Sequence, residues 1–127
     1  MVSSPKKILI CDDDDTLLGL IEAILMGAGY TVITAEDGYE CLDKYASEKP
    51  DMLIVDIDMP NKNGFEVLEE LARQGALNKQ PLFMLSGRER KEDLERASSL
   101  GAKGFIVKPF SGEALIDQVR GALEPPN

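Results

Sequence analysis

DMLIVDIDMPNKNG, at residues 51–64, is the most informative stretch of the chain. Its first part, residues 51–56, has a continuous apolar middle, which is typical of a strand buried on both faces of a parallel sheet. Asp56 ends this strand. Pro60 and Gly64 then predict a tight loop that leaves the end of the strand accessible.

The same alternation of short apolar runs and longer amphipathic runs extends in both directions. Strands are predicted at residues 6–11, 30–34, 51–56, 81–86 and 103–107. Helices are predicted at residues 16–28, 39–47, 64–73, 89–100 and 111–123. The inward face of the first helix is predicted to carry Leu17, Leu20, Ile21, Ile24 and Leu25. Alternating strands and helices predict an α/β fold with a parallel sheet covered on both faces.

The composition fits a globular protein with an acidic surface. The 127 residues fit one domain, with a core at about residues 6–123 and tails at 1–5 and 124–127. The net charge of −9 argues against direct binding of nucleic acid, whose phosphates need a positive surface. Histidine is absent, which excludes Ser-His-Asp catalysis, histidine-ligated zinc and a phosphoacceptor histidine.

Apolar segments and cysteines indicate the compartment. No run approaches the roughly 18 apolar residues of a membrane span, and residues 1–5 lack the apolar stretch of a signal peptide. We therefore expect a cytoplasmic protein that does not enter the membrane. Cys11 and Cys41 are then expected to be buried thiols and not a disulfide.

Four consecutive aspartates, Asp12 to Asp15, follow the first predicted strand. Taken alone, they fit a solvated turn in which Asp14 or Asp15 caps the next helix. Asp56 changes this interpretation, because its strand is expected beside the first one and would gather three carboxylates in one cleft. A hard divalent cation such as Mg²⁺ relieves their repulsion. Asp56 could then act as a nucleophile for phosphoryl transfer and form an acyl phosphate.

Two further residues lie at the carboxyl ends of predicted strands, where ligands of such sheets bind. Lys108 follows the fifth strand and would supply positive charge for phosphoryl transfer, although a lone lysine there is unremarkable. Ser86 ends the fourth strand and would offer a hydroxyl donor beside Gly87. A lone serine at this place more often bonds the backbone.

Together these segments resemble the receiver domains of two-component response regulators, the chemotaxis regulators in particular. The motifs are Asp12-Asp13 after KKILIC, Asp56 in DMLIVDIDMPNKNG, Ser86 in PLFMLSG, and Lys108-Pro109 in GAKGFIVKPF. The resemblance spans residues 6–123 and implies a flavodoxin-like, doubly wound three-layer sandwich with strand order 2-1-3-4-5. It also implies phosphorylation of Asp56 that depends on Mg²⁺, with Mn²⁺ as a substitute.

The resemblance assigns the metal ligands. Asp13, Asp56 and the backbone carbonyl of Asp58 would bind the cation directly, and Asp12 would act through a metal-bound water. The run of aspartates leaves the register open, so Asp13 with Asp14 is an alternative metal pair.

The resemblance also implies a switch. Lys108 would pair with Asp56 and then with its phosphoryl group, and the Lys108–Pro109 bond would be cis. Ser86 would move to bond the phosphoryl group, and Phe105 would turn into the vacated space, although Phe105 fits a plain core residue equally well. The surface of the fourth helix, fifth strand and fifth helix would shift between two packings.

Other interpretations stay open. Asp58 and Arg88 occupy variable positions of the family, and we expect them to pair and tune the lifetime of the phosphorylated state. Asp56-Ile-Asp58 also resembles the motif of haloacid-dehalogenase-type phosphatases, but that motif belongs on a first strand. A flavodoxin-type FMN site would need a phosphate loop where the four aspartates stand. The main alternative is a receiver that is never phosphorylated and serves as a docking module.

The expected partners follow from the missing histidine. The phosphodonor would be a phosphohistidine of a histidine kinase or histidine phosphotransfer protein, and a downstream protein would bind the switched surface. The chain would be a phosphoacceptor that catalyses only its own phosphorylation and dephosphorylation. It is expected to be a monomer or a weak phosphorylation-dependent dimer. The tail at 124–127 fits a stand-alone regulator or a receiver excised from a longer chain.

Overall fold

The computed structural model describes residues 5–87 and 90–124, and this part of the chain forms a parallel sheet of five strands in the order β2-β1-β3-β4-β5. The strands are β1 (Lys7–Cys11), β2 (Thr31–Ala35), β3 (Met52–Asp56), β4 (Leu82–Ser86) and β5 (Gly104–Val107). The helices are α1 (Asp15–Gly27), α2 (Gly38–Glu48), α3 (Gly64–Arg73), the 3₁₀ turn η1 (Ala76–Asn78), α4 (Lys91–Leu100) and α5 (Gly112–Leu123). The predicted doubly wound α/β fold and its strand order are confirmed.

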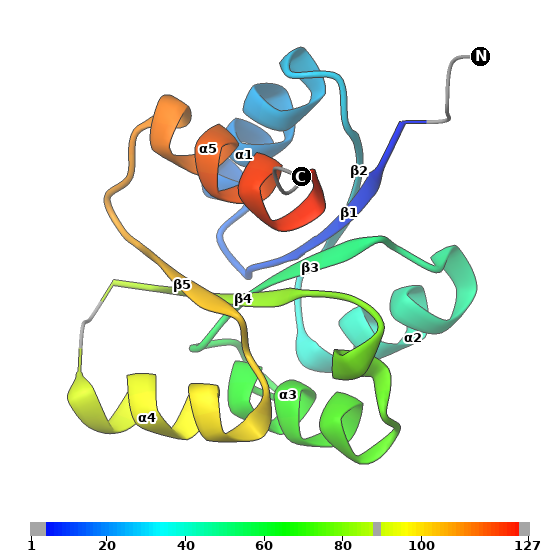
Figure 1. Cartoon of the computed structure of the whole chain (residues 1–127), viewed down its shortest axis with the longest axis vertical. Helices are drawn as coiled ribbons and strands as arrows, with labels where there is room; N and C mark the ends of the chain where they lie inside the picture. Colours follow the sequence, from blue (N-terminus) through cyan, green and yellow to red (C-terminus); the bar gives the residue numbers. More distant parts are fainter. Residues whose placement is uncertain (1–4, 88–89, 125–127) are drawn as a thin grey trace.

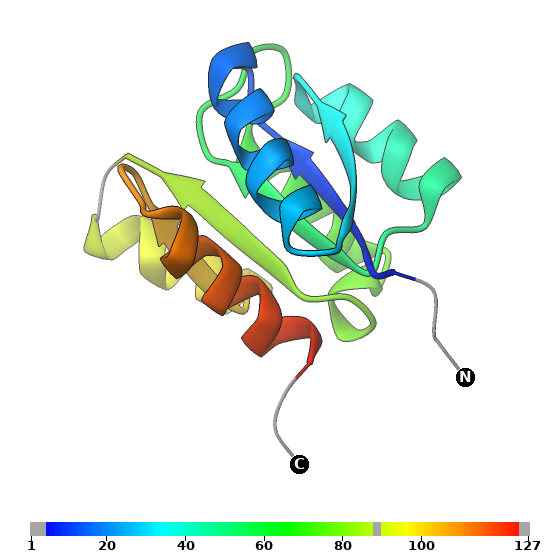
Figure 2. The same ribbon diagram turned by 90° about the horizontal axis from the view of Figure 1, so that it is seen from above.

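The helices form two layers, one on each face of the sheet (Figure 1). Helices α1 and α5 lie side by side on one face, and α2, α3 and α4 cover the other (Figures 1 and 2). Successive side chains of a strand point to opposite faces, so each strand contributes to both cores. In β3, for example, Ile54 packs under α1 and α5, whereas Leu53 and Val55 pack under the other layer.

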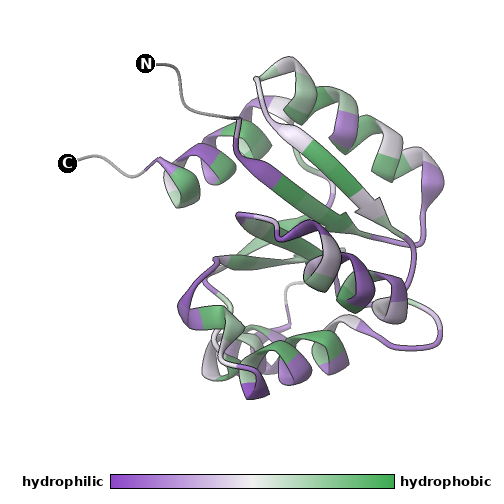
Figure 3. Cartoon of the chain, turned by 90° about the vertical axis from the view of Figure 1, so that its right-hand side faces the viewer, coloured by the Kyte–Doolittle hydropathy of each residue, from purple (hydrophilic) through white to green (hydrophobic). Residues whose placement is uncertain are grey.

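The burial of the strands reflects the helical layers on both faces of the sheet. Every residue of β3 is buried, as expected for a central strand covered on both faces. Figure 3 shows hydrophobic colour over much of the strands and alternating hydrophobic and hydrophilic colour along the helices. None of the described helices has the length and hydrophobicity to cross a bilayer.

Side-chain caps define where several helices begin. Asp14, Asp37, Asn63 and Ser111 each accept a hydrogen bond from a backbone N–H of the first turn of α1, α2, α3 and α5. The interpretation of Asp14 as a cap is therefore confirmed. The loops that precede these helices lie at the carboxyl edge of the sheet, because each follows a strand of the parallel sheet.

Some details differ from the sequence predictions. The prediction that Leu20 faces inward is wrong, because this side chain is 53% exposed and Leu18 is buried in its place. Helix α1 carries apolar residues on most of its surface, so spacing alone does not identify the buried side. The turn η1 was not predicted, because three residues carry no helical periodicity. The predicted start of the fourth helix at residue 89 lies outside the described residues.

Cys11 and Cys41 are both buried free thiols, as predicted. They lie beneath the same helical layer. Burial raises the pKa of the Cys11 thiol well above its ordinary value, and a hydrogen bond with Cys41 adds to this. Both cysteines therefore behave as core residues.

Candidate functional site

The site begins with the pairing of β1 and β3. These strands are parallel neighbours, with Cys11 beside Val55, so Asp12 and Asp56 follow at the same level. Asp56 continues the face of Ile54, which lies under α1 and α5. Alternation along the two strands thus brings two carboxylates to one point at the edge of the sheet.

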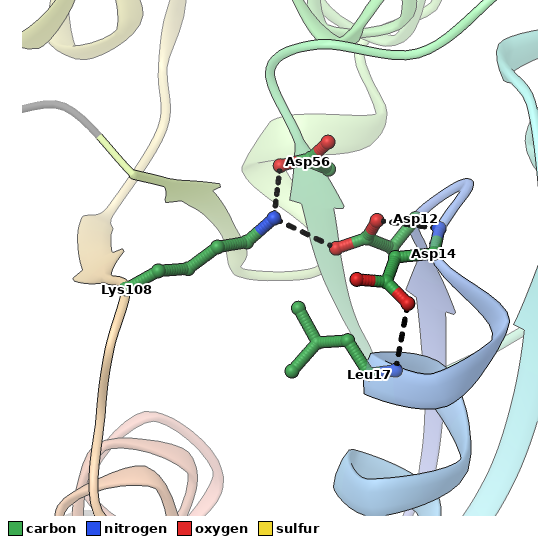
Figure 4. A network of polar contacts seen from close by, with 5 residues as sticks. All are labelled: Asp12, Asp14, Leu17, Asp56 and Lys108. Atoms are coloured by element: carbon green, nitrogen blue, oxygen red, sulfur yellow. Dashed lines mark hydrogen bonds and ion pairs between the residues drawn. The ribbon is translucent and has the colours of Figure 1, made fainter.

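Lys108 completes this arrangement from the end of β5 (Figure 4). Its ammonium Nζ donates a hydrogen bond of 3.0 Å to Asp56 Oδ1. The same Nζ lies 3.1 Å from Asp12 Oδ2, an ion pair without the alignment of a hydrogen bond. Asp12 is 0% exposed and Asp56 5%, so both carboxylates depend on Lys108 for neutralisation in the absence of a further cation. The predicted cis Lys108–Pro109 bond is present.

The environment alters the proton affinity of this cluster. Burial raises the pKa of Asp56 to about 6, against the opposing hydrogen bond from Lys108, and the charge of Asp12 raises it further. Burial alone would lower the pKa of Lys108, but its contacts with Asp56 and Asp12 outweigh this and raise it. Lys108 therefore stays an ammonium, and within residues 5–87 and 90–124 the carboxylates exceed the positive charge beside them.

A divalent cation fits this excess of carboxylates. One oxygen each from Asp12, Asp13 and Asp56 lies within 4.8 Å of the others. Asp12 Oδ2 is buried and accepts no hydrogen bond from the described residues, and Asp13 is exposed at the mouth of the group. Carboxylate oxygens in this arrangement suit Mg²⁺, which keeps several of its own waters.

The four consecutive aspartates, Asp12 to Asp15, have different roles. Asp14 accepts a hydrogen bond from Leu17 N–H at 3.1 Å with its side chain, which directs it to the helix (Figure 4). Its own N–H donates to Asp12 Oδ1 at 3.0 Å and so holds the Asp12 carboxylate in place. The acids that converge are Asp12, Asp13 and Asp56, which argues against the alternative pair of Asp13 with Asp14.

Ser86 and Phe105 lie on the opposite face of the sheet from Asp56. Ser86 ends β4 and is 3% exposed, and its backbone carbonyl accepts a hydrogen bond of 2.7 Å from Lys108 N–H. Phe105 lies beside Met84 in the strand register and packs, half-buried, against the core under α3 and α4. Ser86 and Phe105 therefore share the face covered by α4, and the backbone of Ser86 joins that face to Lys108.

The two residues expected to tune the site are placed less fully. Asp58 is exposed, two residues beyond Asp56. Arg88 lies outside the described residues, so its pairing with Asp58 stays a prediction.

Gly64 shapes the loop that follows Asp56. Its N–H donates to Ile57 O at 2.9 Å, and a Cβ at this position would lie 2.2 Å from Asp56 O. Only glycine permits this approach, so the predicted tight loop is confirmed. A second set of contacts, between this loop and Asp37-Gly38, was not predicted. Its only signal in the sequence is an Asp-Gly pair before a predicted helix.

A parallel sheet of this order, with two buried aspartates and a lysine at its carboxyl edge, defines the receiver class of signalling domain. The family model of the response regulator receiver domain matches residues 8–120. The chain belongs to this family. Membership removes the support for the phosphatase and flavodoxin alternatives.

Individual relatives agree with this assignment. The alkaline phosphatase synthesis transcriptional regulatory protein PhoP of Bacillus subtilis is 36% identical over 118 residues, which are 93% of this chain and 48% of that protein. The chain thus spans about half the length of the curated relatives it matches.

Solved structures show the same architecture. Chemotaxis protein CheY4 of Vibrio cholerae superposes with a TM-score of 0.88 at 33% identity, covering 94% of this chain and 99% of that one. The BeF₃-activated receiver domain of Klebsiella pneumoniae RstA gives 0.87 at 26% identity, over 94% and 99% of the two chains.

Proposed function

We propose that this receiver domain accepts a phosphoryl group on Asp56 from a phosphohistidine of a histidine kinase or histidine phosphotransfer protein. One observation carries the proposal: the Asp56 carboxylate is buried at the end of β3, beside Asp12 and 3.0 Å from the Lys108 ammonium. Family membership supports it.

The chemistry needs an ionised Asp56. A carboxylate oxygen attacks phosphorus, the new O–P bond forms, and the bond from phosphorus to the donor imidazole breaks, leaving that nitrogen to take up a proton. Lys108 neutralises Asp56 beforehand and pairs with the added phosphoryl oxygens afterwards. Asp13, Asp56 and the backbone carbonyl of Asp58 would hold a divalent cation directly, and Asp12 would act through one of its waters. The bound cation would supply the positive charge that phosphoryl transfer requires.

The consequence of phosphorylation is a change of surface. Ser86 and Phe105 share the face of the sheet under α4, so a shift of Ser86 toward the phosphoryl group would leave space that Phe105 can enter. Phe105 has no hydroxyl, and burial of its ring would drive the change. We propose that the surface of α4, β5 and α5 then binds a downstream protein in the cytoplasm. Any dimer that forms there would depend on phosphorylation.

Intact-mass spectrometry after incubation with acetyl phosphate tests the proposal. We expect the wild type to gain the mass of one phosphoryl group with Mg²⁺ and none in EDTA, and we expect no gain for Asp56→Asn. Asp43→Asn, at an exposed aspartate of α2, is the matched control and should behave like the wild type. An unmodified wild type would favour the docking module, and phosphorylation of Asp56→Asn would place the acceptor elsewhere.

A further inference from the structure

The first turn of α2 makes direct contact with the loop between β3 and α3. Gly38 N–H donates a hydrogen bond of 3.1 Å to the backbone carbonyl of Lys62. A Cβ at Gly38 would lie 2.3 Å from that same oxygen. The two segments therefore touch backbone to backbone, an approach that only glycine allows here.

Side chains reinforce this contact on both sides. Asn61 Nδ2 donates to Asp37 Oδ2 at 3.0 Å, while Asp37 Oδ1 accepts from Glu40 N–H at 2.8 Å as the cap of α2. The Lys62 ammonium lies 5.2 Å from the centre of the Tyr39 ring, within the range of a cation–π contact. One carboxylate, that of Asp37, thus serves both the helix and the loop.

The backbone of the loop is adapted to this role. Asn61 has φ 68°, a left-handed conformation that asparagine and aspartate adopt more readily than other residues with a Cβ. This conformation places Asn61 and Lys62 against α2 at the far side of the loop. Gly64 fixes the near side against Asp56 and Ile57.

Asp58 lies in the loop between two fixed points, the contact at Gly64 on one side and the contacts of Asn61 and Lys62 with α2 on the other. The loop has its fixed near end at Asp56 and Gly64, so the contacts of Asn61 and Lys62 restrict how far the backbone at Asp58 can move. The two side-chain contacts lie at the surface and are weak by themselves, but with the backbone bond from Gly38 they act together on a segment of a few residues. Mutation of residues that hold metal ligands in place commonly weakens metal binding by about 10- to 100-fold.

We propose that the first turn of α2 is a clamp on the β3–α3 loop, and that the Asp37–Asn61 contact sets the affinity of the acidic site for its divalent cation. This inference rests on the proposed function of that site. Asp37 and Asn61 are positioning residues, because they would act through the loop and do not belong to the group of converging acids.

Exchanging the side chains of residues 37 and 61 separates the positioning role of their contact from effects of helix capping and of net charge. Asp37→Asn keeps the cap, since asparagine caps helices as well as aspartate does, but it replaces the charge-assisted bond from Asn61 with a weaker bond between two neutral amides, which forms only if the Asn61 amide turns. Asn61→Asp keeps a residue that tolerates the left-handed conformation, but it sets two carboxylates against each other. The double variant restores one donor and one acceptor at the original net charge.

Calorimetric titration with Mg²⁺ alone is the first measurement. We expect each single variant to bind Mg²⁺ about three- to tenfold more weakly, and the double variant to return to within about twofold of the wild type. Through-space charge alone predicts tighter binding for Asn61→Asp, because a negative charge is added near the cation. Tighter binding there, or additive effects in the double variant, would overturn the clamp.

Amide hydrogen exchange in EDTA gives a readout that does not involve the metal. The Gly38 N–H should exchange faster in both single variants and recover in the double variant. Gly38→Ala should also weaken Mg²⁺ binding, whereas Gly19→Ala, where a Cβ meets nothing within 4 Å, should not. Absence of Mg²⁺ binding by the wild type would remove the proposed function and the clamp together. Equal binding by wild type and all variants would remove the clamp alone.

Discussion

Charged side chains at the two ends of the sheet differ in their burial and in their pairing. At the amino end, Lys7 N–H donates to Asp51 Oδ2 at 2.8 Å, and Lys7 Nζ donates to the Glu48 carbonyl at 2.9 Å. Lys7 Nζ also lies 3.6 Å from Glu48 Oε1, and both side chains are partly exposed. At the carboxyl end, buried Asp12 and Asp56 share the single ammonium of Lys108.

This difference separates a stabilising arrangement from a functional one. The amino end offers each charge a nearby partner and water. The carboxyl end concentrates ionised groups where water is excluded, which disfavours the apo protein. Sites that bind ligands commonly retain such locally unfavourable groups, because the ligand compensates for them. We infer that the carboxyl end is less stable than it could be until a cation binds.

Lys108→Met should give the largest effect. It leaves Asp12 and Asp56 buried without their ammonium, so we expect a loss of about 2–3 kcal/mol in the free energy of unfolding near pH 7.5 without metal. Urea denaturation checks this. Lys103→Met is the control, because Lys103 is an exposed lysine just before β5, the strand that Lys108 follows. This substitution should change stability little. Equal effects of the two variants would mean that the ammonium does not neutralise the cluster.

Asp56→Asn should stabilise the metal-free protein, with a defined pH dependence. A carboxyl pKa raised from 3.8 to about 6 disfavours the ionised form by about 3 kcal/mol at most. The folded wild type holds its proton more tightly than the unfolded chain, so its stability falls as pH rises from about 4 to about 6. The advantage of the Asp56→Asn variant should be small near pH 4 and complete above about pH 7.

Denaturation in EDTA across this range checks the prediction. An amide reproduces a protonated carboxyl only approximately beside the Lys108 ammonium, so we expect about 1–3 kcal/mol near pH 7.5. Asp43→Asn should show no such rise. An advantage that is independent of pH would contradict a raised pKa at Asp56.

Lys7→Met, at the other end of the sheet, should have the smallest effect. Its ion pair is partly exposed, so we expect a loss of at most about 1 kcal/mol. The loss should be the same with and without Mg²⁺, as measured by urea denaturation. A loss as large as that of Lys108→Met would remove the contrast between the two ends.

The sequence was sufficient for the fold and for much of the site, for a physical reason. Apolar runs end where strands end, so Asp56, Ser86 and Lys108 could be placed at one edge of the sheet. The capping role of Asp14 followed from residue type. The same reasoning failed for Leu20, because α1 is apolar on most sides and periodicity does not single out the buried face.

Contacts between loops were beyond such reasoning. Asp37 and Asn61 are 24 residues apart, and no periodic pattern links them. Their contact depends on how α2 and the β3–α3 loop meet after the sheet has formed. Glycine and asparagine are residue types suited to turns, but this does not identify the segment that a turn will contact.

The most direct test compares the free energies of unfolding of the wild type and Asp56→Asn near pH 7.5, in EDTA and in saturating Mg²⁺. It decides whether the buried carboxylates form a site for a cation. We expect Asp56→Asn to be the more stable protein in EDTA. Mg²⁺ should close or reverse this gap, since binding to the folded wild type adds about 2.7 kcal/mol at a hundredfold excess over Kd. A gap that is unchanged by Mg²⁺, or a wild type that is already the more stable in EDTA, would contradict this interpretation of the site.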